Sequence, residues 1–129
     1  MKKLILNVKT SKKDQIVDIT SKLSNLVKDL EDQMIVVSVP HTTAAITINE
    51  NYDSDVKTDI IYSLNKISPD YSAFKHMEGN SDAHIKASLF GRSEQIAVID
   101  EELDLGRWEG VYFCEFDGPR TREVWVYVN

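Results

Sequence analysis

The chain has 129 residues, of which 42% are hydrophobic and 28% are charged, enough to bury the core of a single domain over residues 1–129. This composition excludes an intrinsically disordered chain. The formal net charge of −6 and the lack of a basic stripe argue against a nucleic-acid partner. No apolar stretch approaches the ~20 residues that cross a bilayer, and residues 1–7 lack the apolar core of a signal peptide. We therefore expect a cytoplasmic protein with no membrane partner.

Alternating apolar residues predict a strand over residues 4–9 and a shorter one over 16–20. A helix follows, because apolar side chains recur at helical spacing at Leu23, Leu26, Val27 and Leu30. β-Branched residues over 34–39 predict a buried strand that ends at Pro40, and residues 44–49 predict another. The first half is therefore predicted as strand, strand, helix, strand, strand.

The second half starts with a helix between Ser54 and Pro69, whose apolar stripe is Val56, Ile60, Ile61, Leu64 and Ile67. After a mostly polar loop over 70–82, three strands are predicted, over 94–99, 110–116 and 123–128. The resulting order, ββαββαβββ, contains short adjacent strands that favour antiparallel pairing. We predict an α+β fold whose two main helices cover one sheet face.

Polar chemistry gathers around the three histidines, His41, His76 and His84, which lie beside turns and small polar residues. Three neutral imidazoles can hold a zinc or similar divalent metal ion and leave a fourth position for water. The acidic residues available as further ligands or proton acceptors are Glu78, Asp82 and Glu115. The spacing matches no compact metal motif, so the alternative is that each histidine hydrogen-bonds the loop backbone.

A second group of residues suits an anion. Residues 82–91 predict a short helix that Asp82 caps and Gly91 ends. Four residues share one face of this helix: His84, Ala87, Ser88 and Gly91. Arg92 and Arg120 each follow a Gly-containing turn, where backbone N–H groups and a guanidinium group suit phosphate oxygens. The alternative is that the glycines close turns and the arginines pair with surface carboxylates.

Four segments, 41–51, 82–91, 105–110 and 112–120, together resemble the YjbQ-like family, whose members often carry the name secondary thiamine-phosphate synthase. The resemblance runs in order along the chain. It implies a β-sandwich-like α+β domain that assembles as a homotrimer, with a polar pocket near a subunit interface.

Several residues fall on positions of the family's motifs, and they complete the predicted site. The predicted catalytic residues are His41, His84, Glu115 and Glu50, of which Glu50 is alternatively a salt-bridge partner. The predicted substrate-binding residues are Thr42, Asn49, Lys86, Ser88, Gly118 and Arg120. The predicted metal ligands are His41, His76 and His84. Arg107 and Glu109 depart from the family pattern, which has threonine and glutamine there.

The resemblance implies an enzyme that joins a pyrimidine diphosphate to a thiazole phosphate and releases pyrophosphate, as a main or a side reaction. A histidine cluster suits a transition metal better than magnesium, which prefers oxygen ligands. Two alternatives therefore stay open. The first is a metal-assisted hydrolase of a small phosphorylated molecule, and the second is a non-catalytic trimer that binds a metal or a small ligand.

Overall fold

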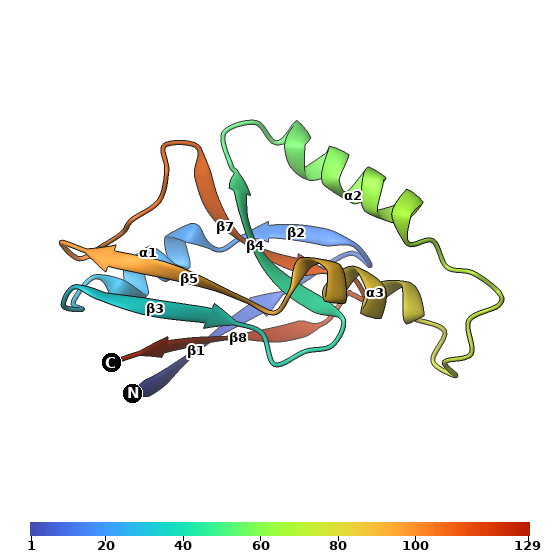
Figure 1. Ribbon diagram of the computed structural model, residues 1–129, viewed down its shortest axis with the longest axis horizontal. Helices are drawn as coiled ribbons and strands as arrows, with labels where there is room; N and C mark the ends of the chain where they lie inside the picture. The colour runs from blue at the N-terminus through green and yellow to red at the C-terminus, as the bar shows by residue number, and fades with distance from the viewer.

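The computed structural model describes all 129 residues, as two antiparallel sheets and three helices (Figure 1). The larger sheet has the strand order β1-β8-β3-β5-β6, and the smaller has β2-β7-β4. Along the chain the elements are β1 (Lys2–Lys9), β2 (Gln15–Asp18), α1 (Thr20–Val27), β3 (Gln33–Ser38), β4 (Ala44–Glu50), α2 (Asp55–Ile67), α3 (Ser81–Phe90), β5 (Ser93–Ile99), β6 (Glu102–Leu103), β7 (Glu109–Glu115) and β8 (Thr121–Val128). The predicted antiparallel α+β fold is confirmed.

The central strand of the smaller sheet, β7, is buried on both faces. Val111 and Phe113 belong to the main core between the two sheets, whereas Tyr112 and Cys114 belong to a second core on the opposite face. This alternation follows from the two-residue period of a strand. Burial on both faces explains why the sequence of β7 contains a continuous apolar run. Burial also raises the pKa of the Cys114 thiol far above its ordinary value, which leaves an inert, protonated side chain.

The helices divide between the two cores. Leu23 and Val27 of α1 enter the main core, while Leu64 of α2 and Ala83 of α3 enter the second core. Figure 1 shows α2 and α3 on the side of β4 and β2, away from the two chain ends. The prediction that the two main helices cover one sheet face is therefore wrong, because the smaller sheet is apolar on both faces and needs a cover on each.

The predicted short helix over 82–91 is present as α3, so the fold has three main helices rather than two. Gly91 ends it with a positive φ of 89°, a backbone conformation that favours glycine. The predicted cap by Asp82 is not formed: the cap residue is Asn80, without a side-chain cap hydrogen bond. None of the helices is long and apolar enough to cross a membrane.

Although β7 and β8 follow one another in sequence, they lie in different sheets. Residues 116–120 carry the chain from one sheet to the other. At Gly118 the backbone passes so close that an added Cβ would lie 2.2 Å from the Lys12 carbonyl oxygen, so only glycine fits. This crossing brings Asp117, Arg120 and Arg122 next to the segment that leads into β4, and it positions the site described below.

Candidate functional site

A polar pocket of about 360 Å³ lies where the start of β4, the loop before α3 and the sheet crossing meet. No hydrophobic side chain lines it. Its lining residues are Pro40, His41, Thr42, Thr43, His76, Glu78, Asn80, His84, Asp117, Arg120 and Arg122. The pocket therefore brings together segments that are up to 82 residues apart in sequence.

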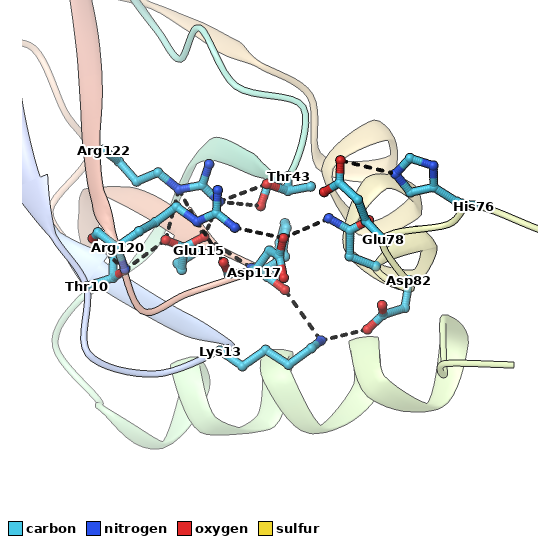
Figure 2. A network of polar contacts seen from close by, with 12 residues as sticks. Thr10, Lys13, Thr43, His76, Glu78, Asp82, Glu115, Asp117, Arg120 and Arg122 are labelled. Carbon is cyan, nitrogen blue, oxygen red and sulfur yellow. Dashed lines mark hydrogen bonds and ion pairs between the residues drawn. The ribbon is translucent and has the colours of Figure 1, made fainter. Parts of the chain in front are cut away.

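All three histidines line this pocket. His41 precedes β4, His76 lies in the loop before α3, and His84 is on α3 itself. The rings of His76 and His84 pack edge to face, with centroids 5.2 Å apart. Figure 2 shows His76 beside Glu78, and the two side chains approach to 4.0 Å between Nε2 and Oε1. The prediction placed these histidines together, and the structure does so.

His41 is fixed as a neutral imidazole. Its Nε2 accepts a hydrogen bond from the backbone N–H of Glu123 at 3.0 Å, so its single proton lies on Nδ1. Burial, and then the nearby charge of Arg122, lower the pKa of His41 below its ordinary value. At neutral pH this side chain therefore presents one N–H donor and no free lone pair.

These residues, as they are placed, do not fit a metal ion. No three side chains among the histidines, acidic residues and Cys114 form a group that could hold one. A metal ligand must offer a lone pair, and His41 has none free, because Nε2 accepts the Glu123 N–H and Nδ1 carries the proton. The structure thus brings the predicted ligands His41, His76 and His84 into one pocket without assembling them into a ligand set.

Beneath the pocket, Glu115 and Arg122 form a buried ion pair. Nε of Arg122 donates to both carboxylate oxygens, at 2.9 and 3.1 Å, and Nη2 contacts Oε2 more closely still. Nη2 also donates to the hydroxyl of Thr43 at 2.8 Å. Figure 2 shows the guanidinium group between Glu115 and Thr43. Arg122 is held rigidly, in the bidentate arrangement that is strongest for arginine and carboxylate.

Glu115 lies under the pocket and does not line it. Burial alone would raise the pKa of Glu115, but hydrogen bonds from Arg122, the Thr10 hydroxyl and the Asp117 N–H hold that pKa below its ordinary value. The carboxylate is therefore ionised at neutral pH and has no contact with the pocket. Its arrangement suits positioning Arg122, whereas the predicted acid–base role would need contact with a substrate.

At the rim, Arg120 is half exposed and is held by Asp117. Its Nε donates to the Asp117 carbonyl at 2.9 Å and its Nη2 to Oδ2 at 3.0 Å. Nδ2 of Asn80 donates to the same Oδ2 at 2.8 Å. The carboxylate of Asp117 thus links the sheet crossing to Asn80 at the start of α3 and orients the Arg120 guanidinium at the rim of the pocket.

A second cavity of about 530 Å³ continues from the first along α3. His41, Thr42 and His84 line both cavities. The residues found only in the second are Ala44, Ala87, Ser88, Gly91 and Arg92. The predicted face of α3 therefore faces this cavity, and Arg92, whose Nη2 donates to the Ser38 hydroxyl at 3.1 Å, also lines it.

Four predicted site residues lie elsewhere. Lys86 is completely buried on another face of α3, where Asp14, Asn65 and Asp82 surround its ammonium group. Asn49 and Glu50 lie at the far end of β4, ~20 Å from its pocket end for a seven-residue strand. Gly118 shapes the crossing but lines neither cavity.

Sequence reasoning missed Arg122, Asp117 and Asn80. A signal for Arg122 exists: it lies on the same face of β8 as the buried valines at 124, 126 and 128, two residues apart along the strand. A charge on the buried face of a strand requires a partner, because isolated buried charges are too costly. No comparable signal marks Asn80, which reaches the pocket only through the packing of α3.

Comparison with known proteins identifies the family of this chain. The chain matches the family described as "UPF0047 protein YjbQ-like" over residues 5–129. It is 49% identical over 123 residues to UPF0047 protein MJ1081 of Methanocaldococcus jannaschii, covering 94% of this chain and 89% of that protein. It is 43% identical to UPF0047 protein YugU of Bacillus subtilis, over 94% of each chain.

Solved structures have the same fold. A YjbQ/UPF0047 protein from Clostridium acetobutylicum is 51% identical and superposes with a TM-score of 0.93, over 98% of this chain and 99% of that one. A YbjQ-like protein of unknown function from Sulfolobus solfataricus, 27% identical, has a TM-score of 0.91 over 97% and 94% of the two chains. The chain belongs to the YjbQ/UPF0047 family.

Proposed function

We propose that this chain is a small-molecule enzyme that binds a phosphorylated substrate in the histidine-lined pocket, with thiamine-phosphate synthase activity as a main or side reaction. One observation carries the proposal: three histidines and two arginines line a single cavity that has no hydrophobic lining residue. Imidazole is the usual group for proton transfer near neutral pH, and guanidinium is the usual group for phosphate recognition.

In the proposed transfer, a thiazole nitrogen forms a bond to the methylene carbon of the pyrimidine diphosphate. The carbon–oxygen bond to the diphosphate breaks, and pyrophosphate leaves with the electron pair. Negative charge grows on the leaving group, so fixed N–H donors and cations accelerate the reaction. Arg120, Arg122 and the Nδ1–H of His41 are the groups of this pocket suited to that task.

The pair formed by His76 and His84 is suited to moving a proton at a substrate hydroxyl or at a water molecule. Glu78 approaches His76 from the pocket wall and can stabilise a protonated imidazole. His84 also lines both cavities, so it can contact a ligand in either one. We therefore propose His84 as the principal acid–base group.

The lining also supports the alternative of a hydrolase that acts on a small phosphorylated molecule. Heteroaromatic rings prefer extended aromatic or apolar walls, and the only aromatic rings that line this pocket are the imidazoles of its histidines. A substrate with a phosphate and a small polar remainder needs no such wall. Phosphate-release assays after dialysis against a chelator, with and without added zinc, test the metal-assisted form of this alternative.

We also propose that the chain assembles as a homotrimer, which the family resemblance implies. Large apolar side chains are exposed on the single chain, among them Tyr52, Tyr62, Ile67 and Leu89. Such side chains commonly mark subunit contacts. Light scattering coupled to size-exclusion chromatography tests the proposal, and a monomer at micromolar concentration would contradict it.

The enzyme proposal is tested by incubating the protein with both thiamine precursors and measuring thiamine phosphate and pyrophosphate. We expect equal amounts of the two products, and a loss of at least ~10-fold in rate for His84→Ala. Ile85→Ala is the matched control, because Ile85 neighbours His84 on α3 but lines neither cavity. Phosphate release from one substrate would favour the hydrolase, and tight binding without turnover would favour a non-catalytic binding protein.

A further inference from the structure

The guanidinium group of Arg122 is only partly used by the protein. Its Nε and Nη2 donate to Glu115 and Thr43, but Nη1 has no hydrogen-bond partner in the chain. Two fully buried side-chain atoms lack a hydrogen-bond partner, Asn80 Oδ1 and Asp82 Oδ1. Nη1 of Arg122 also lacks a partner but is not one of these buried atoms, so it is accessible to solvent. Arg122 is otherwise 97% buried and lines the pocket, so Nη1 is the part of the group that the pocket reaches.

We infer that Arg122 is the fixed anchor for a phosphoryl oxyanion, with Nη1 as the donor and Glu115 as the residue that positions it. This inference rests on the proposed phosphorylated substrate and names the group that would bind it. Neither Arg120 nor Lys86 is equivalent: Arg120 is half exposed at the rim, and Lys86 is sealed on another face of α3.

The local chemistry favours an oxyanion over a cation. The same pocket is lined by neutral His41, whose proton lies on Nδ1, and by Thr42, whose hydroxyl is a further donor. Two carboxylates line the pocket: Asp117, whose Oδ2 is already engaged by Arg120 and Asn80, and Glu78, which lies mostly exposed beside His76. Since Glu115 offsets the charge of Arg122, recognition depends on directed N–H donors more than on net charge.

Glu115 is suited to positioning because donors from three segments hold its carboxylate. It is completely buried, and it accepts hydrogen bonds from Arg122, from the Thr10 hydroxyl at 2.8 Å and from the Asp117 N–H at 3.1 Å. These three donors come from β8, from the end of β1 and from the sheet crossing. The orientation of Nη1 is thus set by the junction of the two sheets.

Calorimetric titration of the full chain with sodium pyrophosphate tests the anchor. We expect wild type to bind and the double variant Glu115→Gln/Arg122→Gln to bind about 10-fold or more weakly, the usual effect of losing a charged hydrogen bond. The double change removes both charges together, so no buried charge is left unpaired. Arg122→Lys should also bind pyrophosphate more weakly. The lysine ammonium group would pair with Glu115 and would have no second nitrogen to donate to the anion.

Arg107→Gln is the matched control: it removes the same charge from a residue stacked on Trp108, outside both cavities, and should bind pyrophosphate as wild type does. Wild-type affinity in a double variant with an unchanged melting temperature would overturn the anchor, as would a wild type that does not bind or an equal loss in Arg107→Gln. Pyrophosphate binding without any turnover of the thiamine precursors would contradict the proposed function but leave the anchor standing.

Discussion

Two clusters in this molecule each bury a basic side chain against carboxylates, and they lie on different sides of α3. In the sealed cluster, the ammonium group of Lys86 contacts oxygens of Asp14, Asn65 and Asp82. In the open cluster, Arg122 pairs with Glu115 but keeps one terminal nitrogen free at the pocket. An ammonium group has three donors and a guanidinium group has five, so similar surroundings satisfy the first and leave donors on the second.

The difference shows that a buried charge does not by itself identify a functional group. Lys86 falls on a family motif and is as deeply buried as any residue in the chain, yet it has no access to the pocket. Arg122 differs from Lys86 because Nη1 of Arg122 carries unused N–H groups that a ligand in the pocket can reach. The sealed cluster is expected to contribute to stability, and the open cluster to both stability and binding.

The largest expected effect is that of Lys86→Met. The change removes the charged hydrogen bonds to Asp14 and Asn65 and leaves Lys13 as the remaining cation beside Asp82 and Asp14, so the free energy of unfolding should fall by about 2–4 kcal/mol. Urea unfolding measures it, with Lys9→Met on the exposed face of β1 as control. The affinity of the remaining folded protein for pyrophosphate should not change, and a selective loss of that affinity would return Lys86 to the site.

Glu115→Gln should lower both stability and binding. Stability should fall by about 1.5–3 kcal/mol, because the buried guanidinium loses its counter-charge but keeps one amide oxygen as acceptor. Pyrophosphate should bind several-fold more weakly, because a single amide oxygen no longer holds both Nε and Nη2 and so no longer fixes the orientation of Nη1. Parallel urea unfolding and calorimetric titration measure the two effects, and unchanged binding would mean that Glu115 is only structural.

Acid should weaken both clusters through their carboxylates. Burial raises the pKa of Glu115 and of Asp82, but their hydrogen bonds outweigh it, and both values lie below the ordinary 4.5 and 3.8 in the folded state. A carboxyl group whose pKa is lowered in the folded state stabilises the fold at pH values above its ordinary pKa. This stabilisation is lost as the pH falls below the ordinary pKa and through the folded-state pKa. The free energy of unfolding should therefore decrease with falling pH below 4.5.

Variants separate the two contributions to this acid dependence. Glu115→Gln should flatten the pH dependence of the unfolding free energy from 4.5 downward, and Asp82→Asn from 3.8 downward. Chemical unfolding at a series of pH values measures the slopes. A wild-type slope in both variants would mean that the pairs contribute no acid sensitivity.

The smallest effect is expected for Arg120→Gln. Its ion pair with Asp117 is half exposed, so its loss should change the unfolding free energy by only about 0–1 kcal/mol. Pyrophosphate affinity should fall a few-fold, which is less than the loss expected for the double variant Glu115→Gln/Arg122→Gln. An equal or larger loss would show that the anchor lies at the rim of the pocket rather than beneath it.

Much of the fold and part of the site could be predicted from local patterns. Strands 34–39 and 44–49 and the helix face of His84 and Ser88 follow from residue spacing, since each pattern depends on residues a few positions apart. The position of Lys86 could not be predicted in this way. A lysine on a short helix has the same local pattern whether it lies at a pocket or against Asp14, 72 residues away.

The sequence by itself determined the antiparallel α+β class, most strands and helices, and the presence of three histidines near turns. Tertiary structure alone decided that β7 and β8 lie in different sheets, and this crossing places Arg122 beside Glu115 under the pocket. The physical reason is the separation along the chain of the residues that determine each property. Strand and helix periodicity is set by neighbouring residues, whereas the state of a buried charge depends on partners that only the packing of distant segments supplies.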